Sequence, residues 1–134
     1  MSFETGKELI DMLFREMQDE YYAIILDFIG GEPFLEADLI DRICDYIKMQ
    51  MYLCNHHWFN SYRFSITTNG INYHSPKVQH FIKKNKKHLS LTITIDGTKQ
   101  KHDMNRLWRD NGTGTKRGSY DAVVRNIPLW LQQF

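Results

Sequence analysis

A carboxylate directly after two glycines is the feature of this 134-residue sequence that most suggests a binding function. Gly30 and Gly31 end an apolar run that starts at Ile24, and Glu32 and Pro33 follow. Two glycines let the backbone turn sharply and approach a ligand closely, while Pro33 favours an extended Glu32 outside the next helix. At the carboxyl end of a parallel strand, this arrangement predicts a site for a positively charged amine. The alternative is a plain strand-to-helix turn with a solvated Glu32.

Two further turns carry polar residues in comparable positions. Asn69 follows an alternating run at residues 62–68, and Asp96 follows another at residues 89–95. Because the carboxyl ends of parallel strands meet at one edge of a sheet, we expect both side chains on the same rim as Glu32.

Histidine and cysteine residues give only a weak indication of a metal site. Cys54 stands close to His56 and His57, but no second pair follows at the spacing of a zinc finger. Adjacent histidines also rarely face the same way on regular structure. Cys44 falls on the apolar face of a predicted helix, so we interpret it as a small buried hydrophobe and assign no metal ligand in this chain.

The elements that must position the polar rim are one leading helix and three strand–helix units. Apolar residues at three- and four-residue steps predict helices over residues 2–19 and 36–52, and a shorter helix begins at Pro76. Strands over residues 22–29, 62–68 and 89–95 alternate with these helices. Such alternation indicates an α/β fold with a parallel sheet and right-handed crossovers.

The last part of the chain predicts one more helix. Ser119 is expected to cap it, as Ser2 caps the first helix, and Pro128 is expected to kink it or divide it. The Gly- and Thr-rich residues 111–118 before it predict a mobile loop.

The strand pattern favours a sheet that is covered on one face only. The second and third strands alternate between apolar and polar residues, and Asp27 interrupts the first. Parallel strands buried on both faces are usually apolar throughout. We therefore expect a partial (β/α) barrel, with helices outside and a polar concave face for a ligand.

Composition excludes several classes of protein. Hydrophobic residues make up 42%, charged residues 25%, and the net charge is +1. This balance gives no sign of nucleic-acid or membrane-surface binding, and no apolar run reaches the ~18 residues of a transmembrane helix. The polar start is not a secretory signal, and two cysteines form no disulfide framework, so a cytoplasmic location is expected.

The three turns together resemble the radical S-adenosylmethionine (radical SAM) superfamily. The similarity is greatest to its peptide- and protein-modifying branch, with the anaerobic sulfatase-maturating enzymes and the SPASM-type peptide maturases. Residues 96–131 also resemble maturases of Cys-rich repeat peptides. The motifs that carry the resemblance are Gly30-Gly31-Glu32-Pro33, Thr67-Thr68-Asn69-Gly70, and Thr94-Ile95-Asp96-Gly97 with His102-Asp103 and Arg106.

The resemblance implies roles for individual residues. Residues 30–33 match the motif that binds the methionine ammonium of S-adenosylmethionine. Thr94 takes the place of a Ser or Thr near the ribose, while Thr67, Asn69 and Asp96 line the same rim. Arg106 is the candidate for the methionine carboxylate, because a guanidinium matches a carboxylate with two parallel hydrogen bonds. These implied binding residues are Gly30, Gly31, Glu32, Pro33, Thr67, Asn69, Thr94, Asp96 and Arg106.

The resemblance also implies a [4Fe–4S] cluster, which the family binds through Cys-x3-Cys-x2-Cys, and this chain has no such motif. We therefore expect residues 1–134 to be a single incomplete radical SAM core domain, truncated at both ends and inactive alone. The full-length protein would form a 5′-deoxyadenosyl radical and modify a peptide or protein substrate.

Two other functions remain open at this point. One is a non-catalytic nucleotide- or peptide-binding module that has lost the cluster. The other is a barrel enzyme acting on a phosphorylated sugar, although no Gly-rich phosphate loop opens a helix here. For the isolated piece, a missing preceding strand would leave residues 22–29 as an unpaired edge strand, which predicts self-association.

Overall fold

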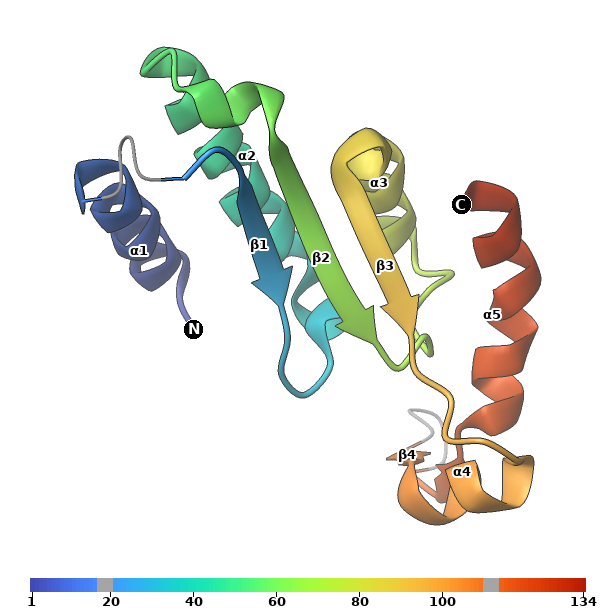
Figure 1. Ribbon diagram of the computed structural model, residues 1–134. Coiled ribbons are helices and arrows are strands. Elements are labelled where there is room, and N and C mark those ends of the chain that lie inside the picture. Colours follow the sequence, from blue (N-terminus) through green and yellow to red (C-terminus); the bar gives the residue numbers. More distant parts are fainter. Residues whose placement is uncertain (17–20, 110–113) are drawn as a thin grey trace.

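The computed structural model describes residues 1–16, 21–109 and 114–134, and its elements alternate along the chain (Figure 1). The strands are β1 (Ile24–Phe28), β2 (Tyr62–Thr68), β3 (Leu89–Ile93), β4 (Leu107–Arg109) and β5 (Lys116–Gly118). The α-helices are α1 (Phe3–Glu16), α2 (Ala37–Leu53), α3 (Pro76–Asn85), α4 (Lys99–Asn105) and α5 (Tyr120–Gln133). Short 3₁₀ helices are η1 (Pro33–Glu36), η2 (His57–Asn60) and η3 (Lys86–His88).

The main sheet contains β1, β2 and β3 in that spatial order, and both pairs are parallel. Asp27 of β1 stands opposite Ser65 of β2, which in turn stands opposite Ser90 of β3. The carboxyl ends of the three strands therefore lie at one edge of the sheet (Figure 1). This arrangement confirms the predicted parallel α/β fold.

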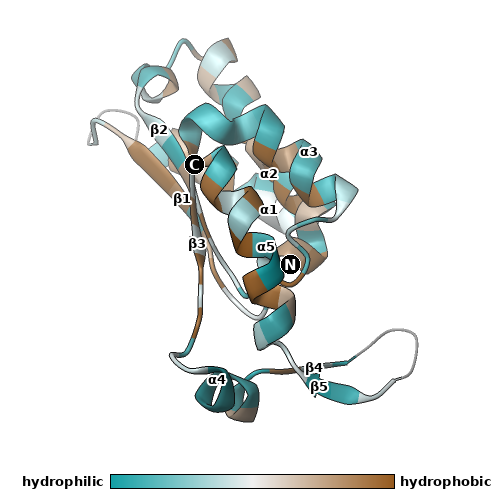
Figure 2. Cartoon of the chain, turned by 90° about the vertical axis from the view of Figure 1, so that its right-hand side faces the viewer, coloured by the Kyte–Doolittle hydropathy of each residue, from teal (hydrophilic) through white to brown (hydrophobic). Residues whose placement is uncertain are grey.

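The helices α1, α2, α3 and α5 all lie on one side of this sheet (Figure 2). Along β2, the side chains of Phe64 and Ile66 are buried toward the helices, whereas Arg63 and Thr67 are exposed on the opposite face. The alternation follows from the two-residue period of a strand. The open polar face predicted from the sequence is therefore present.

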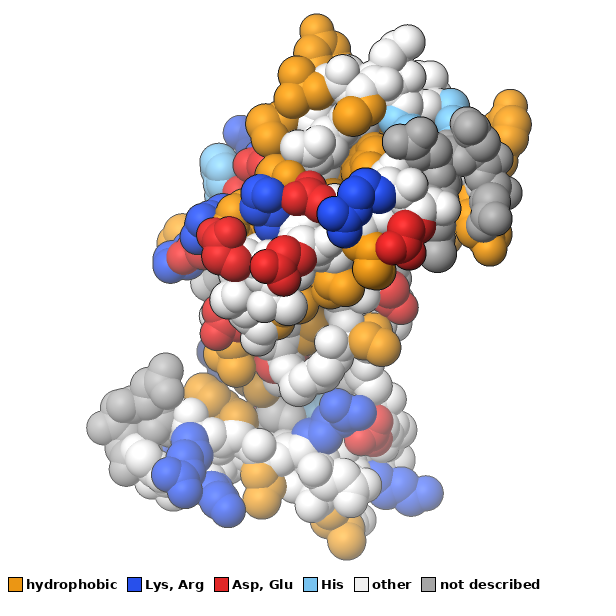
Figure 3. All heavy atoms as spheres, turned by 90° about the vertical axis from the view of Figure 1, so that its left-hand side faces the viewer, with side chains coloured by type: hydrophobic (Ala, Val, Ile, Leu, Met, Phe, Trp, Pro, Cys, Tyr) orange, Lys and Arg blue, Asp and Glu red, His pale blue; other side chains and the backbone are white. Residues whose placement is uncertain are grey.

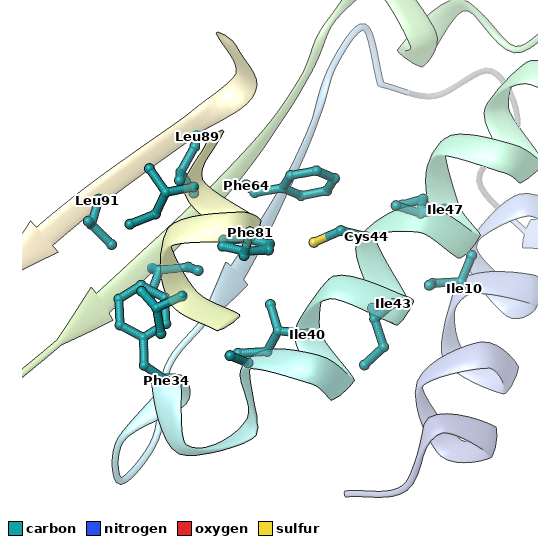
Figure 4. Packing of buried hydrophobic residues seen from close by; sticks show 14 of the residues in the cluster. Ile10, Phe34, Ile40, Ile43, Cys44, Ile47, Phe64, Phe81, Leu89 and Leu91 are labelled. Atoms are coloured by element: carbon teal, nitrogen blue, oxygen red, sulfur yellow. The ribbon is translucent and has the colours of Figure 1, made fainter. Parts of the chain in front are cut away.

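The core lies between the sheet and the helices α2 and α3 (Figure 4). Ile40, Cys44 and Ile47 recur along one face of α2 and are buried against the sheet. Helix α1 packs outside α2, where Tyr46 donates a hydrogen bond of 2.5 Å to Asp11. The core therefore supports the three strands from the helix-covered side of the sheet.

The first helix begins as its sequence indicates. The Ser2 hydroxyl accepts a hydrogen bond from the Thr5 amide at 3.1 Å, which satisfies one of the free N–H groups at the helix start. The described part of α1 ends at Glu16, and the predicted end at residue 19 lies outside the described residues.

The region after β3 differs from the prediction. Residues 99–105 form the helix α4, and residues 116–118 pair antiparallel with β4, although the sequence pattern indicated only a mobile loop at 111–118. The remaining residues of that loop up to 113 lie outside the described part. These β-strands contain three residues each, too few to show a period along the sequence.

The last helix bears on two predicted details. Helix α5 continues through Pro128 and is not divided. Ser119 stands at its N-cap position, but its side chain makes no capping hydrogen bond. Instead, the Ser119 hydroxyl donates to the backbone carbonyl of Arg106 and contacts Nε2 of His102, each at 2.8 Å. The Ser119 hydroxyl is therefore bonded to His102 and Arg106 and does not cap α5.

None of the helices in the described ranges is long and apolar enough to cross a membrane.

Candidate functional site

The loop between β1 and η1 leaves its backbone uncovered. Gly30 has φ +140°, a conformation that side-chain-bearing residues rarely adopt, and a Cβ on Gly30 or Gly31 would meet no atom within 4 Å. Neither glycine is therefore required by packing against the rest of the described chain. Gly30 is required by its backbone angle, and Gly31 leaves space above the loop that a ligand could occupy.

A pocket of about 450 Å³ lies beside this loop. Its volume falls within the range of small-molecule sites in proteins. The acidic residues Asp27, Glu32 and Glu36 are among the residues that line it, together with apolar residues of β1 and α2 such as Phe28 and Ile40. Acidic residues beside apolar walls favour a ligand that carries a positive charge next to an apolar part.

The Glu32 carboxylate is held by the protein on both of its oxygens. Oε1 accepts hydrogen bonds from the Phe34 amide at 3.0 Å and from the Thr68 hydroxyl at 2.6 Å. Oε2 accepts from the Asn69 amide at 2.7 Å. Glu32 thus caps the short helix η1 and joins the end of β1 to the end of β2, which gives the strand-end turn a structural function as well as a charge.

The turn after β2 contains two predicted site residues with different surroundings. Asn69 contacts Glu32 through its backbone, and its side-chain Oδ1 accepts a hydrogen bond from the Ile71 amide at 2.9 Å. Thr67 lies exposed on the open face, opposite Thr92 of β3. Between them, Thr68 is buried and is the residue that reaches Glu32. No motif in the sequence indicated Thr68 as a site residue, although its strand position on the apolar face indicated that it is buried.

Asp96 and Arg106 form an ion pair beyond the end of β3. The guanidinium donates from Nε to Oδ2 at 2.6 Å and from Nη2 to Oδ1 at 3.1 Å. This two-point hydrogen bond lowers the pKa of the Asp96 carboxyl below its usual value. The pair fixes α4 and the β4–β5 hairpin relative to the end of β3.

Thr94 follows β3 directly and extends the pairing of the sheet by one bond. Its amide donates to the Thr68 carbonyl at 3.0 Å.

His102 is fully buried, and its Nδ1 accepts a hydrogen bond from the Asp96 amide at 3.2 Å. Because an amide can only donate, Nδ1 is unprotonated and Nε2 carries the proton. The structure thus connects Glu32 with the turn after β2, and Asp96 with Arg106, as two separate hydrogen-bonded groups on adjacent strand ends.

The cysteine residues do not fit a [4Fe–4S] cluster. Such a cluster is held by several thiolates, whereas this sequence has two cysteines. Cys44 is fully buried in the core between α2 and the sheet, and burial raises the pKa of its thiol. Cys54 is exposed at the end of α2. No group of three or more His, Cys, Asp or Glu residues that could hold a metal ion occurs in the described ranges.

Comparison with known proteins identifies relatives of the chain. Residues 1–116 match the model of the "4Fe-4S single cluster domain" family. An uncharacterized protein of Methanocaldococcus jannaschii is 30% identical over 135 residues, which covers 98% of this chain and 42% of that protein. The chain therefore spans about two fifths of the length of this curated relative.

Solved structures of anSMEcpe share the fold. Native anSMEcpe with bound S-adenosylmethionine (AdoMet) superimposes with a TM-score of 0.70 and 21% sequence identity, over 99% of this chain and 32% of that one. The same protein with bound AdoMet and the Cp18Cys peptide gives a TM-score of 0.68 at 21% identity, over 97% of this chain and 32% of that one. The three parallel strands and their helices thus share the fold of part of anSMEcpe, and the chain belongs to the 4Fe-4S single cluster domain family.

Proposed function

We propose that this chain is the S-adenosylmethionine-binding part of a longer radical SAM protein that modifies a peptide or protein. The observation that carries the proposal is the pocket of about 450 Å³ at the uncovered Gly30–Gly31 loop, with the acidic residues Asp27, Glu32 and Glu36 in its lining. Its charge and its apolar walls suit an ammonium and a sulfonium attached to a hydrocarbon chain.

In this proposal different residues bind different groups of the ligand. Backbone carbonyls of Gly30 and Gly31 accept hydrogen bonds from the methionine ammonium, and the charge of Glu32 favours the protonated amine. Arg106 and Thr94 do not line this pocket, so the ligand would have to extend from it over the ends of β2 and β3. Arg106 then binds the methionine carboxylate with the N–H groups that Asp96 does not occupy. Hydroxyl groups such as that of Thr94 serve the ribose.

The peptide substrate is part of the proposal for the longer protein. Bound peptide is seen in the anSMEcpe structure, which shares the fold with this chain. An iron–sulfur cluster would have to be held by residues outside these 134, because the two cysteines do not fit one. We therefore assign no radical step to this chain and expect it to be inactive on its own.

The two cysteines also favour a second candidate function, a non-catalytic nucleotide- or peptide-binding module. Both candidates require the same pocket, but only the first requires a cluster in the longer protein. Anaerobic purification of that longer protein, with iron and sulfide analysis and a test for 5′-deoxyadenosine release, separates them. Stoichiometric cluster and release of 5′-deoxyadenosine support the enzyme, while bound nucleoside without either supports the binding module.

Binding to this chain is tested by titrating the ¹⁵N-labelled protein with S-adenosylmethionine, methionine and adenosine separately. We expect the amide signals of Gly30, Gly31 and Asn69 to shift with S-adenosylmethionine and with methionine. Glu36→Gln removes one pocket carboxylate that makes no capping hydrogen bond, so it should weaken binding without unfolding η1. If none of the three compounds shifts these signals, the pocket does not bind this ligand and the proposal is wrong.

A further inference from the structure

The turn after β2 is held from two opposite sides. On one side the Glu32 carboxylate accepts from the Thr68 hydroxyl and the Asn69 amide. On the other side, the carboxamide of Asn126 in α5 donates to the Gly70 carbonyl at 2.7 Å and to the Ile71 carbonyl at 3.3 Å. The last helix is thus joined by hydrogen bonds to the turn after β2, and that turn is joined to Glu32 of the proposed ligand site.

The direction of each hydrogen bond around Thr68 follows from which groups can donate and which can only accept. Thr68 is 2% exposed, and its hydroxyl oxygen accepts from the Gly70 amide at 3.0 Å. Because that amide can only donate, the single hydroxyl proton of Thr68 remains available for Glu32, which can only accept as a carboxylate. Removing the Thr68 hydroxyl would leave the Gly70 amide and the Glu32 carboxylate without this hydrogen-bond partner, which would lower the free energy of unfolding.

Packing leaves the turn little freedom to adjust. Gly70 has φ +74°, and a Cβ there would lie 2.9 Å from Cγ2 of Ile93 and 3.4 Å from Cγ1 of Val123. Asn126 is 5% exposed, so its amide hydrogens cannot turn to solvent instead. A change at Asn126 must therefore move the turn or leave the Gly70 carbonyl poorly satisfied.

We propose that Thr68 and Asn126 are positioning residues, which hold the Glu32 carboxylate and the Gly30–Gly31 loop in the ligand-binding conformation. Neither residue is among those that line the pocket of about 450 Å³, so each acts through Glu32. This inference rests on the proposed S-adenosylmethionine site, and it assigns to α5 a role in shaping that site.

The first test measures S-adenosylmethionine affinity by NMR titration of the folded chain. Thr68→Val and Asn126→Leu keep the volume but lose the hydrogen bonds, and each should weaken binding by about fivefold or more. Thr68→Ser retains the hydroxyl and should stay within about twofold of the wild type. Asn85 is a matched control, since this asparagine of α3 is also buried, at 4% exposure, and donates to the Phe81 carbonyl away from the pocket. Asn85→Leu should lower stability but leave the affinity unchanged.

A second measurement needs no ligand, so it separates this inference from the proposed function. The amides of Phe34 and Asn69 donate to Glu32, and their hydrogen exchange reports whether the carboxylate is held in place. Both amides should exchange faster in Thr68→Val and in Asn126→Leu, but not in Asn85→Leu. If Asn126→Leu does not fold, Asn126→Ala takes its place. Failure of the wild type to bind S-adenosylmethionine would end the proposed function while this exchange result still decides the positioning role.

A double variant tests whether Thr68 and Asn126 act through the same turn. If Thr68 and Asn126 act through one turn, the double variant should bind no more than about twofold more weakly than the weaker single variant. If the fold-decreases in affinity of the two single variants multiply in the double variant, Thr68 and Asn126 do not act through one turn. Unchanged affinity and unchanged exchange at Phe34 and Asn69 in both single variants would overturn the proposal.

Discussion

At the scale of single residues, the Glu32 carboxylate combines charge with a structural role. A glutamine in its place has one acceptor oxygen and an NH₂ group that cannot accept from the amides or the Thr68 hydroxyl. Glu32→Gln should therefore lower the free energy of unfolding by about 1–3 kcal/mol, the cost of leaving a partly buried donor unsatisfied. Urea denaturation of both proteins measures the difference. Glu36→Gln, at the other end of the helix η1 that Glu32 caps, is the matched control and should change stability by less than about 0.5 kcal/mol.

The two cysteines should differ in reactivity. Cys44 is fully buried and its pKa is raised by burial, so the nucleophilic thiolate is suppressed, whereas Cys54 is exposed. A thiol-specific disulfide reagent should label one cysteine rapidly in the native protein and both in denaturant. Cys54→Ser should abolish the rapid phase. Rapid labelling of both thiols in the native state would show that Cys44 is accessible and would reopen its interpretation as a core residue.

The pair of Asp96 and Arg106 should give a defined pH dependence. Its hydrogen bonds lower the pKa of Asp96 in the folded state, so its contribution to stability is present above the unfolded pKa of about 3.9 and is lost as the pH falls through the folded value. The stability difference between the wild type and Asp96→Asn should therefore be largest near neutral pH and shrink in acid. Urea unfolding at a series of pH values measures it, and Arg106→Gln should show the same trend. A difference that stays constant down to about pH 2 would contradict this assignment.

At the scale of elements, the turn that follows β2 depends on a glycine for two reasons. Gly70 and Gly97 have nearly the same backbone angle, φ +74° and +75°, but only Gly70 is crowded. A Cβ on Gly70 would lie 2.9 Å from Ile93, whereas a Cβ on Gly97 would meet no atom within 4 Å. Gly97→Ala should cost about 1–2 kcal/mol, from the backbone conformation alone. Gly70→Ala should cost more, because Ile93 must also move. Thermal unfolding of the two variants compares them, and equal costs would show that the packing at Gly70 is loose.

Most elements of the main sheet could be predicted because their patterns are long. The seven residues of β2 alternate between buried and exposed, and α2 repeats its apolar residues over four turns. The hairpin could not be predicted, because its position depends on contacts remote in sequence. A Cβ on Gly118 would lie 2.1 Å from Cγ of Asp103, so this glycine is what allows β5 to approach α4. No local pattern in the sequence predicts that β5 lies against α4.

The candidate site was predictable to a similar extent. Turn chemistry after each strand was sufficient to select Glu32, Asn69 and Asp96, because glycine and polar residues mark strand ends. The partners of these residues were not predictable. Thr68 occupies an inward strand position where an apolar residue would be expected, and Asn126 lies 56 residues from the Gly70 carbonyl that it contacts. Side chains that satisfy buried backbone groups are determined by the tertiary structure and have no periodic signature.

At the scale of the whole molecule, the sheet has an unpaired edge strand within the described ranges. β1 pairs only with β2, and Ile24 directs its amide to the Ser61 carbonyl on that side. By the alternation of a strand, the amides of Ile25 and Asp27 face away from β2. An edge with free backbone groups is a template for pairing with another chain. Figure 3, which views the molecule from the side of α1 and β1, shows hydrophobic side chains exposed among charged ones.

We therefore expect the isolated chain to self-associate through β1. Ile25 is 65% exposed, and Ile25→Lys places a charge on the edge strand, where it opposes pairing with a second chain. Leu131 of α5 is also 65% exposed, so Leu131→Lys is a control with the same change in hydrophobicity and charge at another surface. In sedimentation velocity, the wild type and Leu131→Lys should shift to larger species as the concentration rises, while Ile25→Lys should remain monomeric. A wild type that stays monomeric would show that this edge does not pair, and equal suppression by both lysines would attribute the association to general surface hydrophobicity instead of to β1.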